Sequence, residues 1–269
     1  MMIIIIILFI ISILYLLNKK NKKIAFMFLI YDEINHENLW KLFFNNIDSN
    51  KYNIYIHYKD YKKSDFFDKY KLKTIIPTAY GNISLVKAHN ILLREALKDK
   101  NNTNFILLSN SCIPLKNFNY IYNKLNPNYS YYNIAINLMI SRNMQAFNYI
   151  KNYEFKKASQ WSILNRFHAN ILVNDENKYI NWFINCPDEH SHISYLYYKK
   201  LDNEIIKTYD ASYDATTYTM WINHNLINYD NITNEELLIL YNSKCLFGRK
   251  FTKNCKDLNL LNNLIISNT

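Results

Sequence analysis

The amino-acid sequence predicts an α/β fold, a single domain in which a mostly parallel sheet is flanked by helices. Strand-like and helix-like segments alternate through residues 23–115, as they do in parallel sheets whose crossover connections are helical. The 269 residues are 49% hydrophobic and 16% aromatic, which is enough for one substantial core. The sequence contains no linker or internal repeat, so we expect no second domain.

The first half of the domain supplies the clearest elements. Residues 23–30 (KIAFMFLI) are apolar throughout, which is typical of a strand buried on both faces. After this strand the pattern predicts a helix at 39–44, strands at 52–57 and 73–76, an amphipathic helix at 83–97 and a strand at 105–108. The last strand ends at the sequence SNSCIP.

The second half is less regular. Residues 126–150 show no period and predict a loop or insertion. Beyond them the pattern predicts strands at 159–164 and 217–222 and helices at 166–173, 187–200 and 233–241, the last with a Thr-x-x-Glu capping box. Residues 246–251 close the domain, whose expected range is 24–255, and residues 256–269 are expected to be a polar tail.

Candidate ligand-binding residues follow the predicted strands. Ligands of parallel sheets bind beyond the carboxyl ends of the strands. Tyr31, His57, the Tyr80-Gly81 pair and the segment from Ser109 to Ser111 all fall at that edge. We therefore expect the binding site there.

Glycine is scarce, and its two positions are informative. A usual content of about 7% would give about 19 glycines, yet only Gly81 and Gly248 occur. Glycine is needed where φ is positive or where the backbone approaches a neighbour closely. Gly81 fits either close approach to a ligand or the turn that starts a helix.

The segment from Cys186 to His192 (CPDEHSH) concentrates acids and histidines behind a proline. Pro187 suits the first turn of a helix, where Asp188 and Glu189 would favour the positive end of the helix dipole. A metal site is a second interpretation, because these side chains are all metal ligands. A third is a single general base for group transfer.

The order of motifs resembles that of the core-2/I-branching glycosyltransferases (glycosyltransferase family 14), most closely the plant-type branch. The matching segments, in the family's order, are KIAFMFL at 23–29, YNIYIH at 52–57, AYGNISLVKAHNILLREAL at 79–97, FILLSNSCIPLKNF at 105–118, ASQWSILNR at 158–166, CPDEH at 186–190 and CLFGRKF at 245–251. The resemblance implies a GT-A-like fold with a mixed, mostly parallel sheet. It also implies an inverting transferase that uses a UDP-sugar, usually UDP-N-acetylglucosamine and in some relatives UDP-xylose, without a metal or other cofactor.

The residues agree with this implied chemistry at three points. The chain contains no Asp-x-Asp, and Ser109-Asn110-Ser111 stands where metal-dependent GT-A enzymes have that motif, so a divalent ion has no ligands there. Gly248-Arg249-Lys250 offers cations for the diphosphate instead; the alternative is a solvated basic turn. Lys250 matches the family's diphosphate lysine, whereas the family's second cation is unmatched, and we expect Arg249 to compensate. Glu189 matches the family's catalytic base.

Further positions are implied by the resemblance. Ser159, Trp161 and Trp221 match the acceptor region, and the two tryptophans could stack on a sugar or belong to the core. Cys112, Cys186 and Cys245 match plant-type cysteines. The four cysteines leave room for one or two disulfides.

The amino terminus predicts a membrane anchor, residues 1–18, followed by a basic stem at 19–23. The apolar run 1–17 spans about 26 Å at about 1.5 Å per residue, slightly short of a ~30 Å hydrocarbon core. No small-residue cleavage site follows, which favours an uncleaved single-pass anchor in a Golgi/ER-type or host-cell membrane. The lysines after the run favour a cytoplasmic domain, whereas the family usually faces the Golgi lumen, so the side of the membrane stays open.

Three functions fit the sequence. The leading one is transfer of a sugar, N-acetylglucosamine first, from a UDP-sugar to a hydroxyl of a glycan or glycoprotein. The second is a non-catalytic sugar- or nucleotide-binding descendant of the same family, and the third is a membrane-bound basic interaction protein. The formal net charge of +10 is spread over scattered lysines, so we expect no nucleic-acid partner.

Overall fold

A computed structural model describes residues 22–64, 66–138, 140–210, 214–223, 225–256 and 258–266. The expected anchor, residues 1–18, and residues 19–21 of the expected stem lie outside this range. Among the helices that fall inside it, none is long and apolar enough to cross a membrane.

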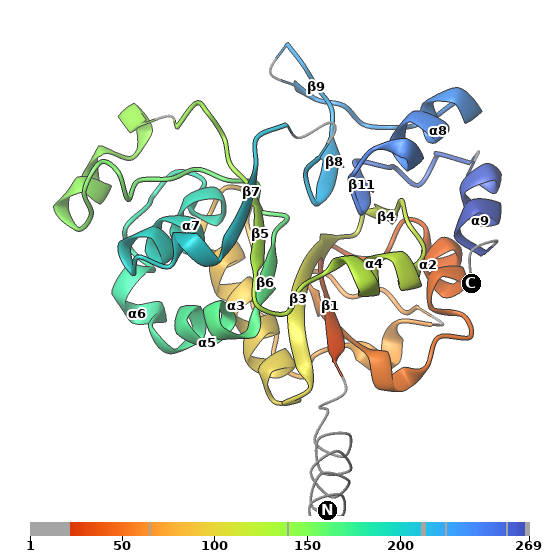
Figure 1. Cartoon of the computed structure of the whole chain (residues 1–269), viewed down its shortest axis with the longest axis horizontal. Coiled ribbons are helices and arrows are strands. Elements are labelled where there is room, and N and C mark those ends of the chain that lie inside the picture. Colours follow the sequence, from red (N-terminus) through yellow and green to blue (C-terminus); the bar gives the residue numbers. More distant parts are fainter. Residues whose placement is uncertain are drawn as a thin grey trace, which may run out of the picture.

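The fold is α/β, with a central six-stranded mixed sheet in the order β2-β1-β3-β6-β5-β7 (Figure 1). The β1–β2, β1–β3 and β5–β7 pairs are parallel, whereas β6 runs antiparallel to both β3 and β5. Two smaller sheets, β4-β11-β8 and β10-β9, complete the described strands. The predicted mixed, mostly parallel sheet is confirmed.

The described strands are β1 Lys23–Ile30, β2 Tyr52–Tyr58, β3 Asn102–Ser109, β4 Ile113–Pro114, β5 Ser130–Asn133, β6 Ile163–Asn165, β7 Ile205–Thr208, β8 Thr217–Thr219, β9 Trp221–Ile222, β10 Asn225–Leu226 and β11 Phe247–Arg249. The α-helices are α2 Glu37–Phe44, α3 Ile83–Leu97, α4 Phe118–Lys124, α5 Arg166–Asn174, α6 Glu176–Tyr179, α7 Pro187–Tyr198, α8 Asn234–Asn242 and α9 Asn259–Ile266. Short 3-10 turns are η1 Ser49–Lys51, η2 Asp68–Tyr70, η3 Ile140–Arg142, η4 Met144–Asn148 and η5 Asp202–Glu204.

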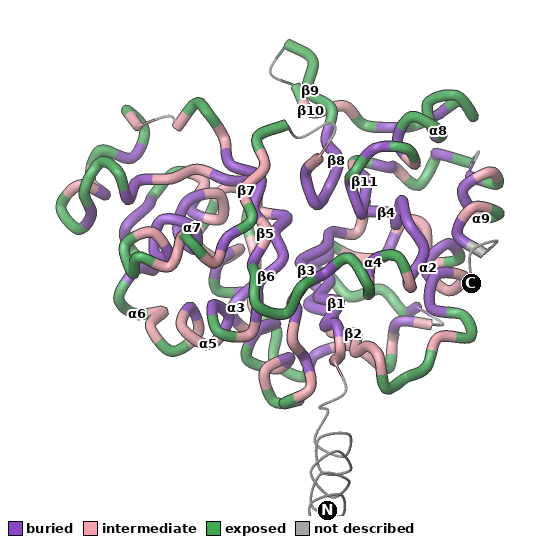
Figure 2. Tube along the Cα trace, viewed as in Figure 1, coloured by how far each residue is buried: buried purple, intermediate pink, exposed green. Residues whose placement is uncertain are grey.

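Strand β1 is apolar because both of its faces are buried. Alternate residues of a strand point to opposite faces. Phe26 and Phe28 belong to the core beneath α2, α4 and α9, whereas Ala25 and Met27 belong to the core beneath α3, α5 and α7. Because helices cover both faces, every position of the strand beyond Lys23 is buried, as the purple centre of Figure 2 shows.

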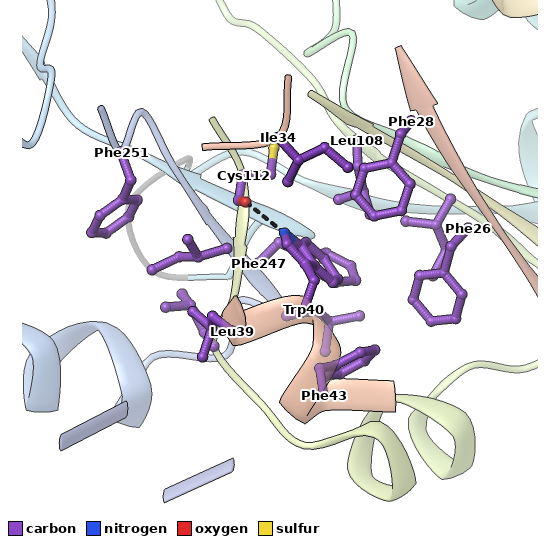
Figure 3. Close-up of a cluster of buried hydrophobic side chains, with 14 of the residues drawn as sticks. Phe26, Phe28, Ile34, Leu39, Trp40, Phe43, Leu108, Cys112, Phe247 and Phe251 are labelled. Carbon is purple, nitrogen blue, oxygen red and sulfur yellow. Dashed lines mark hydrogen bonds between the residues drawn. The ribbon is translucent and has the colours of Figure 1, made fainter. Parts of the chain in front are cut away.

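An aromatic cluster joins the central sheet to the small sheet that carries β11. The Trp40 ring of α2 stacks on Phe247 of β11, with 6.1 Å between ring centroids, and meets Phe28 of β1 edge-on. The Trp40 Nε1 atom donates a hydrogen bond of 3.1 Å to the carbonyl oxygen of Cys112 (Figure 3). This packing holds β11 against the central sheet and thereby fixes the position of Arg249, the last residue of β11.

The predicted strand at residues 73–76 is wrong. Only an isolated bridge, between Ile56 and Lys71, forms beside β2. The Ile76 backbone N–H donates to the His57 Nε2 atom, 3.0 Å away, and the Leu72 N–H donates to Ile56. A side chain thus satisfies a donor that a strand would have paired with backbone.

Other differences lie in short elements whose pairing partners are distant in sequence. The segment 126–150, expected to be a loop, contains β5, and β7 had no sequence signal. The strand predicted at 159–164 is reduced to β6, and the one predicted at 217–222 divides into β8 and β9. Within the expected tail at 256–269 lies α9, whose Leu261 and Ile265 are buried in the core beside α2.

Candidate active site

The carboxyl ends of β1, β2 and β3 lie in one row. Leu29 of β1 pairs with His57 on one side and with Ser109 on the other. The loop after β3 is short and buried: the Ser109 Oγ atom lies 3.1 Å from Ser111 Oγ and 3.2 Å from Cys112 Sγ. The two predicted serines therefore occupy the expected edge, and their hydroxyls bond to each other.

Strand β11 delivers the predicted basic pair to this loop. The Phe251 N–H donates to the carbonyl oxygen of Ser111 over 3.0 Å, which places Arg249 and Lys250 beside the serine loop. A Cβ on Gly248 would come within 3.3 Å of the Leu115 and Phe251 side chains, so glycine here provides room for close packing.

Arg249 is a largely buried cation without an ion pair among the described residues. Its Cζ atom lies 4.3 Å from the centroid of the Trp161 ring, so the guanidinium rests on the indole. The Nε atom is buried and has no hydrogen-bond partner in the described part of the chain. Burial lowers the pKa of Arg249, and the nearby Cys112, Tyr80 and Glu189 oppose this shift. A cation in this setting is ready to receive an anionic ligand.

Lys250 differs from its neighbour. Its side chain is exposed, and its carbonyl oxygen accepts a hydrogen bond of 2.8 Å from the Tyr229 N–H. The basic pair thus consists of one buried cation fixed by packing and one solvated cation beside it.

An asparagine that the sequence did not single out fastens this turn. The Asn35 Nδ2 atom donates to the carbonyl oxygen of Phe251 over 2.7 Å, and the Asn35 N–H donates to the carbonyl oxygen of Asn110 over 2.9 Å. Asn35 thereby joins the loops after β1, β3 and β11. In so Asn-rich a sequence no local signal distinguishes it.

Glu189 lies at the start of α7, as predicted. Pro187 occupies the first turn, and Cys186 before it adopts φ 46° and ψ 53°, a left-handed conformation that turns the chain sharply into the helix. The carbonyl oxygen of Glu189 accepts from the Ala158 N–H over 2.8 Å. The Glu189 Oε2 atom pairs with Lys157 Nζ at 3.2 Å, and the side chain is 32% exposed. The carboxylate is held in place but remains reachable by a substrate hydroxyl.

Asp188 is a buried carboxyl beside Glu189. Burial first, and then the charge of Glu189, raise the pKa of Asp188 to about 6. Its Oδ1 atom has no hydrogen-bond partner among the described residues. The N-cap of α7 is Cys186, which makes no side-chain cap bond, so Asp188 is a first-turn acid and not the cap itself.

The Tyr80-Gly81 turn lies against the same helix start. Gly81 has φ +63°, and a Cβ there would lie 3.8 Å from the Cys186 Sγ atom. Asn82 then caps α3, accepting from the Ser84 N–H over 2.9 Å. Tyr80 is 99% exposed and close enough to Arg249 to influence its pKa. The positive φ of Gly81 confirms the turn that precedes the helix, whereas close approach to a ligand stays a prediction.

Trp161 lies under the Arg249 guanidinium, and Ser159 is two residues before it in the chain. Trp161 is only 8% exposed and carries Arg249 on its ring, which leaves no open face for an acceptor sugar. The Ser159 Oγ atom accepts from the Trp161 N–H over 3.3 Å. Of the two interpretations of Trp161, the structure favours a core residue, and its ring supports the Arg249 cation.

The remaining candidates are spread around the edge. His57 is fully buried within β2 and supports the 73–77 segment, so the nucleotide contact expected of it has no free surface. Tyr31 is 53% exposed, with Lys59 Nζ 4.8 Å from its ring centroid. Trp221 is 56% exposed on the β9–β10 hairpin, which projects at the top of Figure 1.

The histidines after Glu189 are buried structural groups. His190 Nδ1 lies 2.8 Å from the carbonyl oxygen of Lys156, and His192 Nε2 lies 2.9 Å from Asn90 Oδ1. Burial lowers their pKa values to about 4 and about 3, so both are neutral near pH 7. Within the described ranges no three His, Cys, Asp or Glu side chains group as a metal site, and the four cysteines form no disulfide with one another.

Comparison with known proteins finds similarity of differing extent. A plant protein, glycosyltransferase BC10 of Oryza sativa subsp. japonica, is 29% identical over 165 residues, which are 58% of this chain and 41% of BC10. The chain thus matches less than half the length of this relative. Two solved structures overlap it at low TM-scores. The galactosyltransferase LgtC with donor and acceptor sugar analogs has a TM-score of 0.42 and 5% identity over 83% of this chain and 86% of LgtC. The bifunctional glycosyltransferase WbbM in its apo form has a TM-score of 0.41 and 8% identity over 84% of this chain and 45% of WbbM.

A match to a family model shows which family the chain belongs to. The model described as "Branch: Core-2/I-Branching enzyme" matches residues 24–237, which include β1 to β3, the Tyr80-Gly81 turn and the start of α7. Arg249 and Lys250 lie beyond the end of that match. Since this match takes in most of the chain, the chain belongs to the core-2/I-branching enzyme family.

Proposed function

We propose that this chain is an inverting, metal-independent glycosyltransferase of GT-A-like fold. It transfers a sugar, N-acetylglucosamine in the first instance, from a UDP-sugar to a hydroxyl of a glycan or glycoprotein. The observation that carries the proposal is that one segment, residues 158–161, contacts both groups: the Ala158 N–H donates to the Glu189 carbonyl oxygen over 2.8 Å, and the Trp161 ring carries the Arg249 guanidinium at 4.3 Å. A base and a cation at one site are what inverting transfer requires.

Each group has a defined task in the proposed reaction. Glu189 takes the proton of the acceptor hydroxyl while the acceptor oxygen attacks the anomeric carbon from the face opposite the leaving group. The bond to the diphosphate breaks, and UDP departs with the bonding electrons. Arg249 and Lys250 offset the charge that develops on the diphosphate, the role that a metal ion has in other transferases. The Tyr80-Gly81 turn lies beside the start of the helix that carries Glu189, with a Gly81 Cβ position 3.8 Å from the Cys186 Sγ atom.

The serine loop supports a reaction without metal. Hydroxyls and an amide are weak ligands for a divalent ion on diphosphate, and the Ser109 and Ser111 hydroxyls already bond to each other. Arg249 lies beside this loop with its Nε atom unpaired among the described residues. A guanidinium can bind phosphate oxygens in a bidentate manner.

The test is transfer from UDP-sugars by the purified protein, with and without EDTA. Glu189→Gln should lower turnover by about 100- to 10,000-fold, because the general base is lost, while UDP binding stays intact. Glu235→Gln, the same change at an exposed acid in the first turn of α8, is the matched control. Full turnover in Glu189→Gln would remove the base assignment, and loss of activity in EDTA that added metal restores would remove metal independence.

A second candidate, a non-catalytic UDP- or sugar-binding descendant, is favoured by the Lys157–Glu189 ion pair, because a paired carboxylate is a weaker base. Calorimetry that shows UDP binding, together with no turnover on any acceptor, would select this candidate over the enzyme.

We also propose that residues 1–18 anchor the protein in a membrane. Their unbroken apolar run supports this, and the basic residues after it favour retention of the following domain on the cytoplasmic side. Protease protection of a tagged carboxyl terminus in microsomes tests both statements. Digestion without detergent places the domain outside the vesicle, and protection places it in the lumen.

A further inference from the structure

A cavity of about 710 Å³ lies at the amino ends of the central strands, away from the candidate active site. The residues that matter in its lining are Asn128, Tyr129, Arg166, Phe167, Asn170 and Glu204. Asn165, which precedes α5, pairs with Asn104 near the start of β3, whereas Ser109 ends that strand. The cavity is thus at the opposite end of the sheet, beside α5 at the lower left of Figure 1, and its volume is typical of ligand pockets, about 300–1,000 Å³.

The lining combines polar and apolar side chains, and its one cation, Arg166, is already occupied. The Arg166 guanidinium donates to the carbonyl oxygens of Asp99, Asn102 and Leu97 at 2.9, 2.9 and 2.7 Å. The other polar side chains on the wall are amides, the Tyr129 hydroxyl and the Glu204 carboxylate. A phosphate or a carboxylate ligand would find no free positive charge on this wall. The chemistry fits a neutral ligand with several hydroxyls.

Two aromatic rings beside these polar groups are partly exposed to solvent. Phe167 is 52% exposed at the start of α5, and Tyr129 is 37% exposed in the loop before β5. A flat apolar ring next to amide and carboxylate groups complements a sugar, which presents an apolar C–H face on one side and hydroxyls around its rim. An exposed phenylalanine adds an apolar contact surface that a purely polar groove would lack.

A buried histidine is directed at the same wall. His168 is fully buried, its Nδ1 atom lies 2.7 Å from the Ser130 Oγ atom, and its Nε2 atom lies 3.4 Å from Glu204 Oε2. The Nε2 atom makes no full hydrogen bond within the described part of the chain. The Glu204 side chain is 43% exposed, so the buried imidazole faces a carboxylate that still has an open side toward the cavity.

We propose that this cavity is a carbohydrate-binding site, separate from the site of transfer, which takes a neutral saccharide. Phe167 and Tyr129 contact the apolar face of a sugar ring, while Glu204 and the amides of Asn128 and Asn170 bind its hydroxyls. Saccharide binding here does not require transferase activity, so the failure of either proposal leaves the other standing. A chain with both sites could hold a glycan at one end of the sheet while a second glycan chain, or another part of a long one, is at the other end.

The test uses the full-length protein with chitobiose, xylobiose and lactose as probes, observed by saturation-transfer difference NMR in excess UDP. We expect binding of at least one probe, and Phe167→Ala and Glu204→Gln should each weaken it about tenfold, the effect of losing one central contact. Phe167→Tyr should retain binding because it keeps the ring. Tyr149→Ala, at another exposed ring 53% open to solvent, should leave it unchanged.

Several outcomes would overturn the proposal. One is probe binding that survives in both Phe167→Ala and Glu204→Gln; another is no binding of any of the three probes to the unmodified protein. Binding of phosphatidylcholine–phosphatidylserine vesicles that Phe167→Ala abolishes, with no saccharide signal, would assign the aromatic rim to a membrane surface instead. Because Phe167 is exposed, its truncation opens no core cavity, and an unchanged urea-unfolding curve verifies that each variant is folded.

Discussion

The placement of Arg249 on the Trp161 ring gives the sharpest prediction about the donor site. We consider Trp161→Leu, which keeps an apolar side chain but removes the aromatic face. The guanidinium carbon lies 4.3 Å from the ring centroid, within the ~6 Å range of a cation–π contact. Such a contact is worth about 0.5–1 kcal/mol when exposed and about 2 kcal/mol when desolvated. Arg249 is largely buried, so the upper part of this range applies.

Only part of that free energy concerns ligand binding, because Arg249 loses its support in the free protein as well. If about half of it, about 1 kcal/mol, is lost when the diphosphate binds, affinity falls about 5-fold. The assay is isothermal titration calorimetry with UDP and, separately, with uridine. We expect weaker UDP binding and unchanged uridine binding, because uridine has no diphosphate for Arg249 to contact.

Comparing the two ligands separates positioning from general damage. A Trp→Leu change at an 8% exposed position also lowers stability, and a loosened fold would weaken both ligands alike. Trp161→Phe keeps an aromatic face and should retain most of the UDP affinity, whereas Arg249→Lys keeps the charge but loses the planar group and should resemble Trp161→Leu. Equal loss for UDP and uridine, or no loss for either, would refute the reasoning.

Three further predictions concern stability, measured by urea unfolding. Folding raises the pKa of Asp188 from 3.8 to about 6, so the folded state binds this proton more tightly than the unfolded one. The stability due to this group is present at low pH and lost as pH rises through about 6; Asp188→Asn should therefore raise the unfolding free energy by about 1–3 kcal/mol at about pH 8 and by little at about pH 4. An equal effect at both pH values would contradict the burial of this charge. Gly81→Ala should cost about 1–2 kcal/mol, because φ is +63° and the Cβ meets only ordinary contacts; a neutral result would mean that the turn relaxes. Thr233→Ala removes the side-chain half of the capping box of α8 and should cost about 0.5–2 kcal/mol, while Thr233→Ser should restore most of it.

Elements with their own periodicity were predictable. β1, β2, β3 and α3 appear where the sequence placed them, because a strand buried on both faces and an amphipathic helix each carry a pattern within their own residues. The capping box of α8 and the proline at the start of α7 are also local signals, and both are present. The central sheet and the position of Glu189 at a helix start followed from these patterns.

Short strands were not predictable, because they depend on pairing partners that are distant in sequence. β5 pairs with β6 and β7, and its segment resembles a loop until those partners are in place. The 73–76 segment has strand-like residues but forms no strand, because the Ile76 N–H donates to the His57 side chain. α9 packs on α2, from which it is separated by most of the chain, so its buried Leu261 and Ile265 resembled residues of a polar tail.

The sequence by itself determined the family, the core strands and the candidates Glu189 and Arg249, because motif order and local pattern are properties of neighbouring residues. Only the tertiary structure decided what these residues contact. It placed Trp161 under Arg249, joined Asn35 to the β11 turn, paired Glu189 with Lys157 and enclosed Asp188. Each of these contacts joins or encloses residues that lie far apart along the chain, and burial, which sets the pKa values of Asp188 and Arg249, exists only once the strands and helices have packed.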